Sequence, residues 1–393
     1  MHSQPHQPDN SYRTSLYYSP EKHGNRRTMF MVAMKCYRVA VALACTMLFS
    51  ASVGAFPIPE QRLLKMLGES DVVAVVLVQQ VTTLGFGSVE VHGDPIRAEF
   101  RVAQLRFTQV LKGSAPPDGT VSVRYTLLRP AAGWAGGIPE HYALSDSLPP
   151  NAFRIVFLKH SADAYSLTDG AYLSISAPAK YCSIATDGLA SQLVSCLRDT
   201  LMSRNASFDD RRSTLYQLDE MTNAHVVPSL RDFLNSEAAQ RSSELRGETL
   251  RILILRHDES MVDAATTLLL QPLMSSESKN YCAWKGNIMS AFTRTLPPSR
   301  SVPVLSQALH LAEPTTRRHA AESLGDTNSP LAISPLLSAI TDADPQVAFN
   351  AMQGLGNLTK QYDWRPHSSS KDEDWFRCLR HWQEYRDSPS HPQ

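Results

Sequence analysis

The chain has 393 residues, of which 42% are hydrophobic and 19% are charged, and its 38 basic residues balance its 38 acidic ones. At roughly 100–200 residues per domain, this length predicts about two domains. The hydrophobic content excludes a disordered chain, and the balanced charge lacks the basic footprint of a general nucleic-acid binder. A single apolar stretch approaches the length of a membrane span, which excludes a polytopic membrane protein.

The N-terminal part of the chain carries an export pattern. Residues 1–28 are polar and mixed, and we interpret residues 1–33 as a disordered leader or as the product of a mis-assigned start codon. Residues 34–55 combine Lys35 and Arg38 with an uncharged run of 17 residues that ends in small side chains. This pattern is typical of a secretory signal peptide, and the run is short for a membrane-spanning helix. We therefore expect a periplasmic or secreted protein without an integral membrane span after cleavage; a signal retained as an anchor is the alternative.

Four cysteines follow the signal segment: Cys182, Cys196, Cys282 and Cys378. An exported compartment permits disulfides. A bond between Cys182 and Cys196, which are 14 residues apart, would contribute about 3 kcal/mol in the chain-entropy model. The alternative is that all four are small buried apolar side chains. The chain has no Cys-x-x-Cys pair, which argues against a zinc ribbon or a thioredoxin-type site.

Residues 56–181 have the pattern of a small β-barrel or sandwich. An apolar run at 72–78 has the length of a buried strand, and residues 121–127 alternate between apolar and polar. Between 98 and 107 the apolar face, which begins with Ala98, Phe100 and Val102, changes parity, and this predicts a bulge within that strand. A strand at 153–158 and a short hairpin around Thr168-Asp169-Gly170 give five or six strands in all.

The order of these elements resembles the netrin-like and oligonucleotide-binding barrels. The shared features are a strand after Asp71, a long strand ending in Val110-Leu111-Lys112-Gly113, and a late Ile155-Val156-Phe157-Leu158 strand. The resemblance implies a barrel over residues 66–180. Metalloproteinase inhibitors of that family ligate the zinc of the enzyme through an N-terminal cysteine, whereas the mature chain here would begin near Phe56 without one.

Residues 129–150 form a long predicted loop, and long loops frequently carry binding sites. Trp134, His141 and Tyr142 are candidate partner-binding residues within it. The alternative is an insertion whose aromatic side chains fold back onto the barrel. A protease inhibitor acting through this loop is therefore a second functional hypothesis.

Past a connecting helix in residues 182–204, the hydrophobic period changes from two to about 3.6. Residues 205–361 are expected to form helical repeats, because residues 301–325 match residues 332–356 at an offset of 31. Each matched unit is an apolar helix, an acid-proline turn and an Ala-rich second helix. The second helix ends in a glycine, which we expect to supply a left-handed stop. Residues 362–393 are predicted to be a capping helix and tail, with three apolar side chains on one face: Trp375, Leu379 and Trp382.

This repeat resembles the HEAT repeat, in the short form of the phycobilisome lyases. The resemblance implies stacked helix pairs that present a surface to a protein partner. Three residues on the second helices are candidate partner-binding residues, with a solvated face as the alternative: Arg317, Arg318 and Phe349. A lyase or chaperone for a cofactor-bearing protein is a third hypothesis that this resemblance suggests.

The sequence lacks the common signatures of hydrolases, zinc proteases and nucleotide-binding enzymes, namely Gly-x-Ser-x-Gly, His-Glu-x-x-His, the P-loop and Gly-x-Gly-x-x-Gly. We predict a multidomain β + α protein, a small β-barrel followed by a HEAT-type solenoid. Its predicted function is that of an exported, non-enzymatic scaffold that binds a protein or peptide. We predict no catalytic residue, metal ligand or cofactor, and no nucleic-acid partner.

Overall fold

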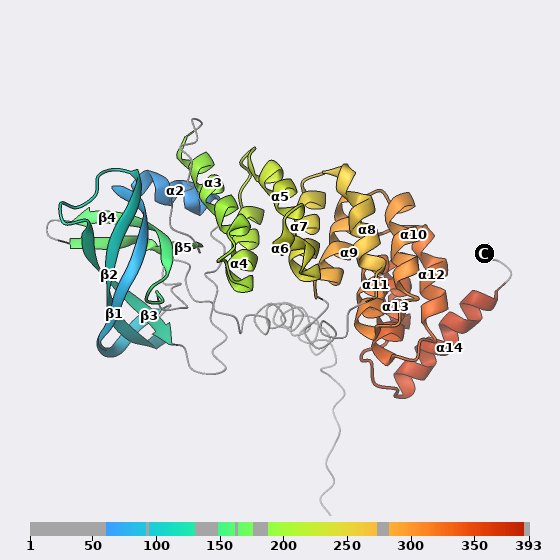
Figure 1. Cartoon of the computed structure of the whole chain (residues 1–393). Coiled ribbons are helices and arrows are strands. Elements are labelled where there is room, and N and C mark those ends of the chain that lie inside the picture. Colours follow the sequence, from blue (N-terminus) through green and yellow to red (C-terminus); the bar gives the residue numbers. More distant parts are fainter. Residues whose placement is uncertain are drawn as a thin grey trace, which may run out of the picture. The chain divides into compact units, whose positions relative to one another are not determined.

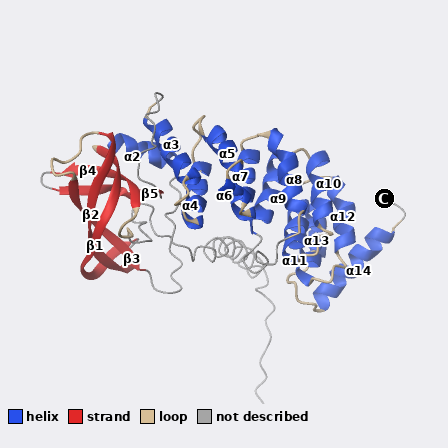
Figure 2. Ribbon diagram, viewed as in Figure 1, coloured by secondary structure: helices blue, strands red, loops and turns tan. Residues whose placement is uncertain are grey.

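The computed structural model describes residues 60–91, 94–129, 148–161, 164–175, 188–272 and 283–388. The predicted leader, the predicted signal peptide and most of the predicted loop at 129–150 lie outside these residues. Within them, a closed five-stranded β-barrel is followed by a series of α-helices, so the predicted fold class is confirmed (Figures 1 and 2). No helix among these residues has the length and apolar content that a membrane span requires.

The barrel follows helix α2 (Glu60–Glu69) and closes in the strand order β1-β2-β3-β5-β4. All neighbouring strands are antiparallel except β3 and β5, which pair in parallel. The strand bounds are β1 (Val72–Val91), β2 (Asp94–Lys112), β3 (Thr120–Arg129), β4 (Phe153–Ser161) and β5 (Ala164–Ile175).

The first residues of β1 are buried on both faces, which explains their uninterrupted apolar sequence. Ala74 and Val76 belong to the cluster that fills the barrel, together with Leu105 of β2. Val73 and Val75 belong to a second cluster on the outer face of the barrel. That second cluster also contains side chains of α2 and of the helices α3 (Leu189–Met202) and α4 (Phe208–Asp219), so the barrel and the first helices share one hydrophobic core.

The Leu-Lys-Gly sequence at the end of β2 connects three elements. Lys112 Nζ donates to the carbonyl oxygens of Leu67, at 2.5 Å, and Gly68, at 3.3 Å, near the C-terminus of α2. Gly113 has φ +77°, and a Cβ there would lie 2.2 Å from the carbonyl oxygen of Asp71. These three residues therefore join α2, β1 and β2, and the motif has a structural explanation.

One detailed prediction about the strands is wrong in position, and a second is wrong altogether. β2 pairs with β3 without interruption from Arg97 to Arg106, so its bulges do not lie between Val102 and Leu105; against β1, the extra residues of β2 are Thr108 and Leu111, near its end. The parity changes because Ala98 packs in a small cluster with Ile96 and Leu128, separate from the barrel interior that contains Leu105. Phe100 is consequently 37% exposed. The predicted hairpin at Thr168-Asp169-Gly170 is also wrong, because β5 continues through these residues with a register shift against β4.

In the described part of the chain, the helices from α3 to α13 form five pairs, and the second helices of successive pairs lie side by side. These second helices are α4 (Phe208–Asp219), α7 (Ser243–Leu255), α9 (Ala283–Thr295), α11 (Pro314–Asp326) and α13 (Pro345–Leu358), and we name them the second-helix row. Their partners are α3 (Leu189–Met202), α5 (Val226–Leu234), α8 (Val262–Leu270), α10 (Pro298–Ala308) and α12 (Ile333–Ala339), with short α6 (Glu237–Gln240) after α5. Because α11 contacts α13, the two matched segments stack as predicted.

The helix starts follow the sequence signals, whereas the predicted glycine stops do not occur. Ser207 and Asp210 form the predicted capping box of α4, and the Asp344 side chain accepts hydrogen bonds at the start of α13. Gly325 lies inside α11 and has no positive φ, so it is not a left-handed stop. Residues with a left-handed backbone do follow α11 and α13, but they are Asn328, with φ 51°, and Lys360, with φ 62°.

Helix α14 (Glu373–Asp387) packs against α12 and α13, the last pair of the array. It buries Trp375 and Trp382, as the spacing of these aromatic residues indicates. The Trp382 indole Nε1 donates to the carbonyl oxygen of Trp364 at 2.8 Å. The His381 ring stacks on the Trp364 ring with centroids 4.0 Å apart. The C-terminal segment therefore covers one end of the helical array.

Candidate interaction surface

Glycines bring the helices of the second-helix row close together. A Cβ on Gly247 of α7 would lie 2.5 Å from the Trp284 ring of α9, and one on Gly286 of α9 would lie 2.8 Å from the His319 ring of α11. Gly325 of α11 meets the backbone of Gly354 of α13 in the same way. Three consecutive junctions thus use a glycine, and the row is continuous from α7 to α13.

A polar network joins the helices at the N-terminal part of this row. Arg251 of α7 pairs with Asp219 of α4 and with Glu248 of its own helix, both at 2.7 Å. The Asn287 Nδ2 of α9 donates to Glu248 Oε1 at 2.6 Å. Arg212 of α4 lies 3.1 Å from Asp209 and 3.6 Å from Glu244. These contacts hold charged groups of α4 and α7, and a polar group of α9, in fixed positions.

Tyr216 of α4 lies within the electrostatic reach of this network and is 36% exposed. Burial raises the pKa of its phenol, and the nearby Glu248 carboxylate raises it further. Burial also raises the pKa of Glu244, although Arg212 opposes that shift. Tyrosine and arginine are enriched among the residues that dominate binding at protein interfaces, which makes Tyr216 a candidate contact residue.

Arg317 and Arg318 of α11 are both paired within the array. Arg317 makes a bidentate contact with Asp342 at 2.8 Å, and its pKa is raised mainly by this hydrogen bonding. Arg318 pairs in the same way with Asp344, at 2.6 and 3.0 Å. Both arginines therefore connect α11 to the turn before α13. A role of these residues in binding a partner stays a prediction.

The other predicted site residues have different positions. Phe349 of α13 is half-buried against the helical core. Trp134, His141 and Tyr142 lie outside the described residues, as does Cys182. Cys196 of α3 is disulfide-bonded. Its pairing with Cys182 stays a prediction.

The network around Tyr216 was not predicted from the sequence. Its α7 members follow a spacing of i, i+4 and i+7, as Glu244, Glu248 and Arg251, which places them on one helix face. That spacing was available in the sequence. Their partners Asp219 and Asn287 are more than 30 residues away from Arg251 and Glu248, respectively, and only the fold brings them together.

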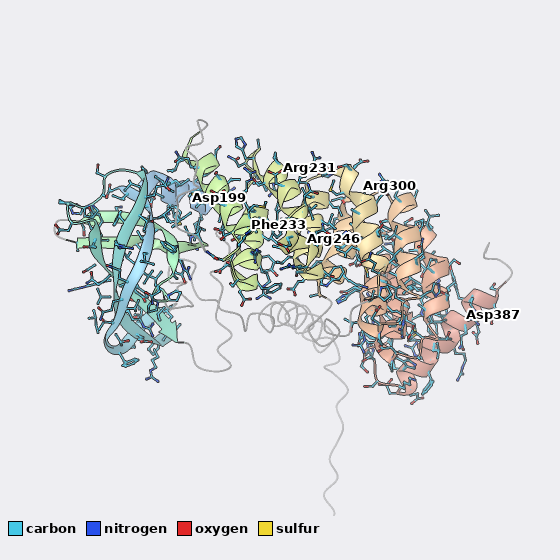
Figure 3. The ribbon with its side chains drawn as sticks, in the orientation of Figure 1. Asp199, Arg231, Phe233, Arg246, Arg300 and Asp387 are labelled. Carbon is cyan, nitrogen blue, oxygen red and sulfur yellow. The ribbon has the colours of Figure 1, made fainter. Side chains whose placement is uncertain are left out.

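A second set of ion pairs holds the turn between α7 and α8. Arg231 of α5 pairs with Asp258 at 2.8 Å, and hydrogen bonding to Arg231 lowers the pKa of this aspartate. Arg300 of α10 lies 3.1 Å from the adjacent Glu259. Figure 3 shows Arg231 and Arg300 along the same edge of the helices. These ion pairs connect the first helices α5 and α10 to the turn before α8. They do not involve side chains of the second-helix row.

The described residues contain no group of three or more His, Cys, Asp or Glu side chains arranged to hold a metal ion. The fold and this surface define an α-solenoid with an N-terminal β-barrel. Residues 294–363, which contain α10 to α13, match the family model of HEAT repeats. A comparison of the whole chain with curated proteins finds no match.

Proposed function

We propose that the protein is an exported, non-enzymatic scaffold that binds a protein or peptide on its second-helix row. The observation that carries this proposal is the continuous row of α4, α7, α9, α11 and α13, whose polar groups are fixed by contacts between helices. Helical repeats present extended surfaces of this kind to their partners. Such a surface offers shape and hydrogen-bonding groups over a long distance, which suits an extended peptide or the face of a folded domain.

Two observations support export. Residues 34–55 have the charge and apolar pattern of a signal peptide. Cys196 is disulfide-bonded, and such bonds persist mainly in oxidising compartments. N-terminal sequencing of the protein recovered from the exported fraction tests this part of the proposal. A start near Phe56 is expected, and an intact N-terminus in the cytoplasmic fraction would contradict it.

We also propose the two finer family resemblances, that of the barrel to the netrin-like and oligonucleotide-binding barrels and that of the repeats to the phycobilisome lyases. Both are compatible with the fold. The closed five-stranded barrel suits a netrin-like or oligonucleotide-binding type of barrel. The inhibitor hypothesis depends on residues 129–150, most of which lie outside the described residues. The lyase or chaperone hypothesis depends on the resemblance of the repeats alone. The scaffold proposal has the support of the geometry around Tyr216, which neither alternative uses.

A capture experiment with matched variants tests the scaffold proposal. The protein is crosslinked to its partners in the exported fraction, and the captured proteins are compared with those of Tyr216→Ala. Tyr362→Ala is the control, because Tyr362 is also an exposed tyrosine (50%) and lies in the C-terminal segment after α13. We expect the Tyr216 variant to lose a partner that the control retains. Equal capture by both variants would contradict the proposal.

A further inference from the structure

The first strand of the barrel has a long edge without a neighbouring strand. β4 pairs with β1 only from Val72 to Leu77, and the last backbone contacts on that side join Val78 to Asn151 and Ala152. From Gln79 to Val91, β1 pairs with β2 on its other side alone, within the described part of the chain. About two thirds of β1 therefore has no strand pairing at one edge within the described residues.

This edge is open to solvent. Most residues from Gln79 to Glu90 are exposed, including Leu84 at 57% and Phe86 at 65%. These two are the most exposed large hydrophobic side chains in the barrel strands that the structure describes. The Arg97 guanidinium lies over the Phe86 ring, 5.4 Å from its centroid, and within the described residues no further strand pairs with this edge.

Part of this edge lacks the usual protection against strand pairing: bulges at Gln79 and Leu84 interrupt its first half, whereas Gly85–Val91 contains none. Exposed edges commonly carry lysine, proline or several charges, which prevent another strand from adding to the sheet. Between Gln79 and Val91 the chain contains no lysine or proline, and Glu90 is the only charged residue. Register shifts in β1 lie at Gln79 and Leu84, so from Gly85 onward the strand follows β2 residue by residue. The segment Gly85–Val91 is thus a regular template for an added strand.

We propose that this edge pairs antiparallel with the same edge of a second copy of the chain, which joins two barrels through a continuous sheet. An antiparallel edge is self-complementary about a two-fold axis, because each strand offers the other the same alternation of donors and acceptors. Its single charge places almost no like-charge repulsion across that axis. The pairing also covers the Phe86 and Leu84 side chains of both copies. This dimer is independent of the partner bound by the helices.

The mass of the full chain in solution, measured by light scattering over a wide concentration range, tests the proposal. Phe86→Lys places a charge on the edge, and Phe376→Lys makes the same change on α14, where Phe376 is also exposed. We expect a concentration-dependent dimer for the wild type and the Phe376 variant. For the Phe86 variant, we expect the dissociation constant of the dimer to rise about tenfold or more.

Hydrogen exchange locates the contact without relying on a variant. The amides of Gly85–Val91 are expected to exchange more slowly as the protein concentration and the dimer fraction rise. A wild-type monomer at all concentrations would overturn the proposal. A dimer without concentration-dependent protection of this segment, or one unaffected by Phe86→Lys, would overturn it as well.

Discussion

Gly325 of α11 and Gly354 of α13 contact each other through their backbones. A Cβ on Gly325 would lie 2.8 Å from the Cα of Gly354, and a Cβ on Gly354 would lie 2.9 Å from the Cα of Gly325. The two matched repeats therefore pack at a distance that no other residue type permits at this point. Gly247 and Gly286 likewise allow close packing of α7 against α9 and of α9 against α11.

Replacing Gly325 by alanine is expected to destabilise the fold. The added methyl group must separate α11 from α13, and such overpacking costs about 1–3 kcal/mol, against a gain of about 1 kcal/mol in helix propensity. Gly68→Ala in α2 is the control, because a Cβ there meets no atom within 4 Å. Urea unfolding should give a lower midpoint for Gly325→Ala and an unchanged or higher one for Gly68→Ala.

Arg256 closes the C-terminus of α4. Its Nη2 donates to the carbonyl oxygens of Leu218 at 3.0 Å, Asp219 at 2.8 Å and Met221 at 2.5 Å. Arg256→Met keeps most of the side-chain volume and leaves these carbonyls without the charged donor. We expect a loss of about 2 kcal/mol in the free energy of unfolding.

The control for this variant is Arg241→Met. Arg241 is an exposed residue that pairs with Glu237 one helical turn away. Exposed pairs of this type contribute little, so its unfolding curve should overlay that of the wild type. An equal loss of unfolding free energy in both variants would show that the hydrogen bonds of Arg256 to these carbonyls do not stabilise the fold more than an exposed ion pair does.

Asp199 of α3, labelled in Figure 3, is expected to make stability depend on pH. Its Oδ2 is buried without a hydrogen-bond partner among the described residues. Burial raises its pKa from 3.8 to about 6, although Arg198 opposes the shift. The native state then holds the proton more tightly than the unfolded chain, so the stability contributed by protonation is lost as pH rises from about 4 to about 6.

Asp199→Asn should therefore stabilise the protein at pH 7. We expect a gain of about 1 kcal/mol, because the half-exposed position of the carboxyl group reduces the full effect of its shift. Below about pH 4 the aspartate is protonated in both states, and the difference between variant and wild type should disappear. Thermal unfolding at a series of pH values checks this, and a difference that does not change with pH would contradict it.

Trp382 fixes the C-terminal cap to the last helix pair. It is fully buried, and its indole Nε1 donates a hydrogen bond to the carbonyl oxygen of Trp364. Trp382→Ala is expected to cost about 3–5 kcal/mol. Phe376→Ala on the exposed side of the same helix should cost much less. Proteolysis should then release α14 from the Trp382 variant before the rest of the array unfolds.

Much of the helical half could be predicted from the sequence, because its stacking units repeat. The offset between Pro314 and Pro345 predicts two equivalent helix pairs, and α11 and α13 indeed lie side by side. The role of Gly325 could not be predicted, since a glycine near a helix end indicates a left-handed stop as readily as a close contact. Its φ and its approach to Gly354 decide between the two.

The barrel and the interaction surface were less predictable. Alternation places Phe100 and Ala98 on one face, but it cannot show that only the part of that face around Ala98 is covered. In the second-helix row, the pairs of Arg251 with Asp219 and of Asn287 with Glu248 join positions 32 and 39 residues apart. Sequence spacing within a single helix contains no information about such contacts.

The most direct test of the scaffold proposal is the footprint of a captured partner on the helices. Hydrogen exchange of the full chain, with and without the purified partner, should show protection on α4, α7, α9 and α11. The turn between α7 and α8 should remain unchanged, because its ion pairs are made with Arg231 and Arg300 of the first helices α5 and α10. Protection confined to that turn or to the barrel, with the second-helix row unaffected, would contradict the account.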